Sequence, residues 1–180
     1  MINLFINMKI TGILFILFIL GCNHQEKKNK ADPKADQDFR DKIIQSHQAF
    51  LEKENSRIDK YIDSLDLEFV KTGTGLRYFI KKEKPQGDTI KSGDHALITY
   101  QLMSLEGDTL YTSPEGHVQE FMVDFEDVER GLHEGIKYLK TGESAIFILP
   151  AHLAHGITGD QAAIGPQTTL VYHLTVVGKK

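Results

Sequence analysis

The segment from Val128 to Gly135 reads Val-Glu-Arg-Gly-Leu-His-Glu-Gly and governs the expected fold of the last hundred residues. Around it, residues 126–139 carry apolar side chains at helical spacing, namely Val128, Leu132, Ile136 and Leu139. This periodicity predicts a short amphipathic helix. Residues 144–149 and 169–177 follow it and are rich in β-branched and aromatic side chains, which predicts strands. We therefore expect a helix that packs on a sheet.

Three more strands are predicted upstream of this helix. Residues 75–80 follow the helix-breaking run Thr-Gly-Thr-Gly and form the first of them. Residues 95–103 contain aromatic and β-branched side chains, and a turn at 105–108 leads into a returning strand at 109–113. Many antiparallel strands around one helix predict the α+β fold class.

Residues 39–70 precede the strands and form a predicted helical extension. Apolar side chains recur there every three, four, seven or eight residues, at Phe39, Ile43, Phe50, Leu51, Ile58, Tyr61, Ile62 and Leu65. Such a stripe has to be buried against another surface. Docking onto the chain's own sheet or helix is one alternative, and dimerisation or client binding is the other.

The amino terminus carries a secretory pattern. Lys9 precedes the apolar run Ile10 to Leu20, which ends in Gly21 and Cys22. Gly-Cys after an apolar run resembles the lipobox of bacterial lipoproteins, which implies a signal peptide at 1–21 and lipidation of Cys22. A transmembrane anchor is the alternative, but it needs roughly 20 apolar residues. Residues 22–38 are polar and Lys-rich, which predicts a flexible tether between the lipid and the protein.

Composition and charge exclude several classes of function. The chain has 21 Lys and Arg against 25 Asp and Glu, a net charge of −4, which disfavours binding to nucleic acid. Cys22 is the only cysteine, so an intrachain disulfide cannot form. His152 and His155 lack the cysteine or carboxylate neighbours of a metal site. The polar residues Glu129, Arg130, His133 and Glu134 are expected on a solvated helix face.

The order and spacing of these motifs resemble an FKBP-type peptidyl-prolyl isomerase domain. The resemblance rests on the 128–135 segment, Lys-Thr-Gly-Glu at 140–143, Leu-Pro at 149–150, Leu-Ala-His-Gly at 153–156 and the closing strand, and it covers residues 75–177. It implies an antiparallel half-barrel wrapped around the short helix, in a domain at 71–180. It also implies catalysis by an apolar cleft that uses no cofactor or metal, on proline-containing polypeptides.

The family's pocket residues carry over to this chain as Tyr100, Leu110, Tyr111, Phe121, Val128, Glu129, Leu132, His155, Ile164 and Tyr172. The resemblance implies that the backbone N–H of Glu129 binds a ligand carbonyl. Tyr111 stands where the family usually has Asp, and His155 where it usually has Tyr. We expect these departures to remove polar contacts worth about 1–3 kcal/mol each, which predicts a weak or substrate-restricted isomerase that can be pH-dependent if His155 titrates in the cleft.

The match resembles most closely the FKBP-like lipoproteins associated with gliding motility in Bacteroidetes. The features in common include the lipobox, the helical extension and Tyr-Thr-Ser at 111–113. This implies a lipid-anchored protein of the cell envelope, on the periplasmic side of the outer membrane, that folds exported, outer-membrane, motility or secretion proteins. Two alternatives remain: a module that binds proline segments without turnover, and a holdase chaperone. The helical extension leaves a homodimer open.

Overall fold

The computed structural model describes residues 33–84 and 86–180, so the predicted signal peptide and Cys22 lie outside the described residues. The elements follow in the order α1 (Pro33–Leu65), β1 (Val70–Lys71), β2 (Arg77–Lys82), β3 (His95–Ser104), β4 (Thr109–Thr112), β5 (Gln119–Met122), α2 (Arg130–Ile136), β6 (Ser144–Leu149), a 3₁₀ turn η1 (Ala151–Leu153) and β7 (Leu170–Lys179). The predicted α+β class, with a half-barrel and an amino-terminal helix, is confirmed.

The strands form one antiparallel sheet in the order β1-β2-β6-β7-β3-β4. β3 pairs with two strands along one of its edges. His95 to Ile98 pair with β5, and Gln101 to Met103 pair with β4. The other edge of β3 pairs with β7 along its whole length. β1 was not expected, because Val70 ends the predicted helical extension and Lys71 begins the predicted domain.

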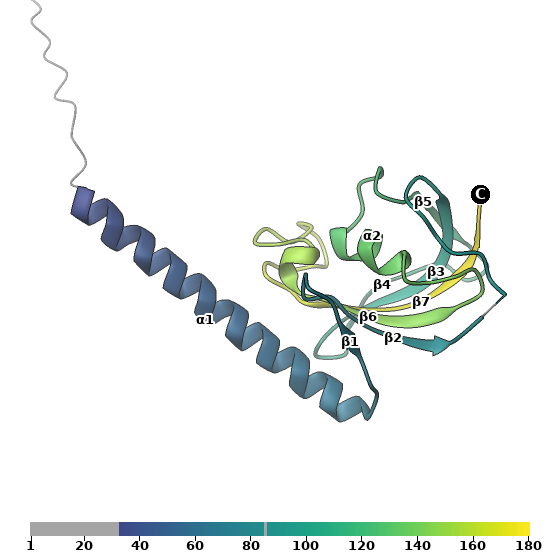
Figure 1. Cartoon of the computed structure of the whole chain (residues 1–180), viewed down its shortest axis with the longest axis horizontal. Helices are drawn as coiled ribbons and strands as arrows, with labels where there is room; N and C mark the ends of the chain where they lie inside the picture. Colours follow the sequence, from purple (N-terminus) through teal and green to yellow (C-terminus); the bar gives the residue numbers. More distant parts are fainter. Residues whose placement is uncertain (1–32, 85) are drawn as a thin grey trace, which may run out of the picture. The chain divides into compact units, whose positions relative to one another are not determined.

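β6 and β7 are the centre of the structure because both of their faces are covered. In β6, Ala145, Phe147 and Leu149 join the core beneath α2, whereas Ile146 and Ile148 face the opposite side. Figure 1 shows α2 lying across the concave face of the sheet. Burial on both faces explains why β6 is apolar almost throughout instead of alternating.

Helix α1 is longer than expected. Pro33 is its first residue, a position where the missing N–H of proline costs nothing, so residues 33–38 of the predicted tether are helical. Asp66 ends the helix with a left-handed φ of 52°. The chain divides into two compact units after Lys42. Within the described residues, no helix combines the length and the apolar character needed to cross a membrane.

The carboxyl-terminal half of the apolar stripe of α1 is buried against the chain's own sheet. Ile58 is fully buried and packs with Ile146, Ile148 and Val171 on the convex face. This observation favours the first alternative, docking within the domain, for that part of the helix. Near its amino-terminal end the stripe is different, since its exposed members are Phe39 and Ile43, together with neighbouring Ile44.

Helix α2 is shorter than the predicted 126–139 segment. The chain before it forms tight turns, in which the N–H of Val128 donates to the carbonyl of Glu126, and Glu129 is the N-cap. After Ile136, the N–H of Leu139 donates to the carbonyl of Ile136 in a tighter turn. Val128 and Leu139 are at helical spacing, but they pack on the core from turns.

Gly135 is a helical position where a side chain would clash with the core. A Cβ there would lie 2.6–2.9 Å from three ring atoms of the fully buried Phe147. We expect Gly135→Ala to lower the free energy of unfolding by about 1–2 kcal/mol, because overpacking outweighs the gain of about 1 kcal/mol that Ala has in a helix. Urea unfolding measures this. Gly73→Ala is the control, because nothing lies within 4 Å of a Cβ at that exposed turn; an equal loss there would contradict the steric explanation.

Candidate functional site

A cavity of about 270 Å³ opens between α2, the strands β3 to β5 and the loop between β6 and β7. Its lining is mostly apolar or aromatic, with acidic residues among them. The lining residues are Ile98, Tyr100, Leu102, Tyr111, Gln119, Glu120, Phe121, Asp127, Val128, Glu129, Leu132, His155, Asp160, Ile164 and Tyr172. The cavity is thus assembled from segments up to 74 residues apart, which the sheet topology brings together.

Aromatic rings form one wall of the cavity. Tyr100 on β3 and Tyr172 on β7 have ring centroids 5.6 Å apart at an angle of 56°, a tilted contact between neighbouring strands. Leu132 from α2 and Phe121 from β5 are buried in the core next to them. This side of the cavity is therefore apolar and packed against the core.

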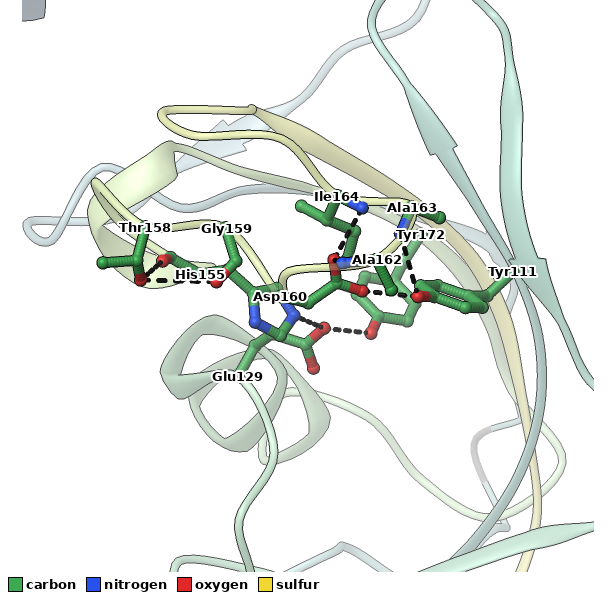
Figure 2. A network of polar contacts seen from close by, with 10 residues as sticks. All are labelled: Tyr111, Glu129, His155, Thr158, Gly159, Asp160, Ala162, Ala163, Ile164 and Tyr172. Atoms are coloured by element: carbon green, nitrogen blue, oxygen red, sulfur yellow. Dashed lines mark hydrogen bonds and ion pairs between the residues drawn. The ribbon is translucent and has the colours of Figure 1, made fainter.

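Glu129 lines the cavity as expected, but its side chain is less exposed than predicted. Its side chain is only 9% exposed, whereas a solvated helix face was expected. The Tyr172 hydroxyl donates to Oε1 of Glu129 at 2.8 Å, and Nε2 of His155 donates to the same oxygen at 3.1 Å. The expectation was wrong because Glu129 is the N-cap, with an extended ψ of 136°, and does not occupy a helical position. Figure 2 shows the three side chains converging from the N-cap of α2, from β7 and from the β6–β7 loop.

The carboxylate of Glu129 changes the titration of the aromatic wall. Burial, and then the nearby Glu129 charge, raises the pKa of Tyr172 far above its ordinary value. The same two causes raise the pKa of Tyr100. Both hydroxyls therefore stay protonated throughout the physiological range, so that Tyr172 remains a hydrogen-bond donor to Glu129.

A second polar cluster holds the loop over the cavity. The Tyr111 hydroxyl donates to Oδ2 of Asp160 at 2.5 Å. The N–H groups of Ala162 and Ile164 both donate to Oδ1 of Asp160 at 2.8 Å. Figure 2 shows this cluster beside the Glu129 group. Tyr111 and His155 were expected to leave the cleft with fewer polar contacts. Instead, Tyr111 donates a hydrogen bond to Asp160, and His155 donates one to Glu129.

Nine of the ten residues expected in the pocket line the cavity, and Leu110 does not. Leu110 lies on β4 and packs against the core instead. The sequence interpretation missed Ile98 and Leu102, although alternation along β3 from Tyr100 would have found them. It also missed the carboxylates of Glu120, Asp127 and Asp160, for which no periodic signal exists.

The Tyr111–Asp160 contact leads to a prediction about how the loop contacts depend on pH. The Tyr111 hydroxyl, followed by the two backbone N–H groups, lowers the pKa of Asp160. Because the folded-state pKa is lowered, these contacts stabilise the loop above the ordinary carboxyl pKa of about 3.9 and are lost as the pH falls through the folded-state value. We expect Tyr111→Phe to raise the pKa of Asp160 towards its ordinary value, as measured by NMR titration of the carboxyl carbon.

The control for this titration is Asp94, whose lowered pKa comes mainly from the hydrogen bond with Lys179. Its pKa should be the same in both proteins. An unchanged Asp160 pKa in Tyr111→Phe would show that the backbone N–H groups alone hold the carboxylate.

The half-barrel and its aromatic-walled cavity define a class of domain in which a cavity lies between a sheet and a short helix. The chain belongs to the family of FKBP-type peptidyl-prolyl cis-trans isomerases, whose family model matches residues 87–177. A probable member from Haemophilus influenzae is 28% identical over 158 residues, which cover 84% of this chain and 64% of that protein. A probable FkpA from Neisseria meningitidis is 31% identical over 152 residues, with 84% and 49% covered. The chain thus matches less than two thirds of either relative.

Solved structures show the same fold. FkpA from Escherichia coli superposes with a TM-score of 0.61 at 25% identity, over 82% of this chain and 70% of that chain. A peptidyl-prolyl isomerase from Pseudomonas syringae gives a TM-score of 0.64 at 18% identity, over 74% and 95% respectively. The second likeness concerns the fold alone.

Proposed function

We propose that this protein catalyses cis-trans isomerisation of peptide bonds that precede proline. The observation that carries the proposal is the apolar cavity with an available backbone donor at its rim. The N–H of Glu129 donates to no acceptor among the described residues, so it can bind a substrate carbonyl. The cavity of about 270 Å³ accommodates a proline ring and part of a neighbouring residue.

The chemistry follows from the electronic structure of the amide. Rotation about the bond crosses a barrier of about 20 kcal/mol, which comes from resonance between nitrogen and carbonyl. In the twisted transition state this resonance is lost and the carbonyl is less polar. An apolar wall such as Tyr100, Phe121 and Leu132 therefore binds the transition state better than the planar ground state.

The test is an isomerisation assay on the full-length chain in nonionic detergent, with a protease-free peptide substrate and with a refolding protein limited by proline. Acceleration in both would support an enzyme. If neither is accelerated while the folded structure is intact, the cavity is a binding site for proline segments without turnover. The relation of rate to pH between 5 and 8 tests whether His155 contributes, since its side chain contacts Glu129.

We further propose that the protein is lipidated at Cys22 and held in the cell envelope, on the periplasmic side of the outer membrane. The support is the apolar run up to Leu20 followed by Gly21 and Cys22. Metabolic labelling with palmitate, followed by membrane fractionation, tests the anchor. Cys22→Ser should lose both the label and the membrane association; a membrane-bound Cys22→Ser protein would favour a transmembrane anchor.

We propose exported and outer-membrane proteins as clients, including motility and secretion components. The support is the resemblance to gliding-motility lipoproteins in the lipobox and in Tyr-Thr-Ser at 111–113. A deletion strain should accumulate misfolded envelope proteins, and a normal envelope proteome would contradict this role.

We also propose that α1 supports a homodimer, since Ile43 and Ile44 are exposed. Light scattering of Ile43→Glu against the wild-type chain tests it, and a monomeric wild type would refute it.

A further inference from the structure

The wall of the cavity contains a nearly buried carboxylate with unused acceptor capacity. Oε1 of Glu129 accepts from Tyr172 and from His155. Oε2 of Glu129 accepts no hydrogen bond from the described residues, and Figure 2 shows it outside the drawn network. A carboxylate offers about four acceptor positions. Glu129 can therefore take a further donor from a bound ligand.

The other lining residues add to this negative charge. Glu120, Asp127 and Asp160 also line the cavity, and none of the lining residues that the structure describes is Lys or Arg. His155 is the one member of that lining whose side chain can become positive. A ligand entering the cavity thus meets a predominantly negative rim around an apolar floor.

Nearby cations belong to other contacts. Arg130 follows Glu129 in the sequence, but it lines a separate depression together with Glu134 and Lys137. Lys180 pairs with Glu120 at the exposed edge of β5. These positions leave the Glu129 charge to be balanced by His155 or by the ligand itself.

We propose that Glu129 makes the cavity select proline segments in which a Lys or Arg flanks the proline. This inference rests on the isomerase function proposed above and names its substrate class. The proline ring would occupy the apolar floor at Leu132, while the ammonium or guanidinium group meets the carboxylate. An ion pair is stronger in a partly dry wall than in bulk water, and an acidic flanking residue is repelled there.

The experiment compares peptides that differ only in the residue before proline, which is Lys, acetyl-Lys, Leu or Glu. With the full-length chain, kcat/KM should be about tenfold higher for Lys than for Leu, a difference that corresponds to about 1.4 kcal/mol. Glu should be the poorest substrate. Acetyl-Lys keeps the length of the side chain but lacks its charge, so it should behave like Leu. This comparison tests the charge without changing the protein.

Variants then assign the preference to a residue. Glu129→Gln should reduce the ratio of kcat/KM between Lys and Glu peptides to within about threefold. Glu134→Gln removes the same charge from α2 outside the cavity, and we expect it to keep the wild-type ratio. Thermal unfolding of each variant verifies that it is folded at the assay temperature.

The outcomes separate the two proposals. No acceleration of any peptide refutes the isomerase function itself. Equal acceleration of all four, or a Lys preference that persists in Glu129→Gln, overturns the inference and leaves the isomerase function standing. Loss of the preference in Asp127→Asn but not in Glu129→Gln would overturn the assignment to Glu129 and place selection at the exposed rim.

Discussion

Leu132→Gln is expected to reduce kcat/KM for a proline peptide by about tenfold to a hundredfold. Leu132 is 4% exposed and lines the cavity from α2. The side chains are similar in size, but the amide of Gln brings a polar group into the apolar floor. It would stabilise the planar, polar ground state of the substrate and so reduce the differential binding of the transition state by about 1.4–2.8 kcal/mol.

The matched control is Leu139→Gln. Leu139 is fully buried in the same core but does not line the cavity. Both substitutions should lower the free energy of unfolding by about 2–4 kcal/mol, since each buries an amide in place of an apolar group. Peptide kinetics well below the unfolding temperature should show a large loss only for Leu132→Gln. Equal losses would mean that stability, and not the cavity, controls the rate.

Glu54→Ala is expected to lower the free energy of unfolding by about 3 kcal/mol. Glu54 lies on α1, and its side chain is buried, with 4% exposed. Its Oε1 accepts from the N–H of Ala151 at 2.7 Å and from the Thr169 hydroxyl at 2.7 Å. Removal leaves two buried donors without an acceptor, each at a cost of about 1–3 kcal/mol. Urea unfolding measures the change.

This contact also ties α1 to the two ends of the loop that carries His155 and Asp160. We therefore expect Glu54→Ala to raise KM for a proline peptide, since the loop over the cavity loses its fixed ends. Glu52→Ala is the control, because Glu52 is exposed on the same helix and should change stability by less than about 0.5 kcal/mol. A Glu54→Ala protein as stable as the Glu52→Ala protein would show that water replaces the carboxylate.

Five of the seven strands were predictable because their signal is local. β6 was expected at 144–149 and is found at Ser144–Leu149, and β3 differs from the expected 95–103 by one residue. β-branched and aromatic content, bounded by turn residues, is readable within a few positions. The helix at 126–139 was too long, because spacing alone does not show where a turn replaces helical hydrogen bonds.

The carboxylates were not predictable in the same way. Glu54 and Glu129 both occupy positions that suit an exposed helix, yet each is buried by partners that come much later in the chain. Oε1 of Glu54 accepts from Thr169 and Oε1 of Glu129 accepts from Tyr172, two residues from the last part of the fold. A buried charge is tolerated only when such donors are present, and no local pattern records them.

The sequence by itself determined the fold class, because hydrophobic periodicity and turn chemistry act over short distances. Its resemblance to a known family supplied the family and most of the apolar residues around the cavity. Only the tertiary structure decided that the carboxylate of Glu129 is held in the cavity wall, that Leu110 does not line the cavity and that Glu54 anchors the loop. Glu129 bonds to Tyr172, 43 positions away, and Glu54 bonds to Thr169, 115 positions away. Such contacts depend on how the strands pair. The chemistry of the wall therefore follows from strand register, which brings Tyr172 of β7 beside Tyr100 of β3 and within reach of Glu129.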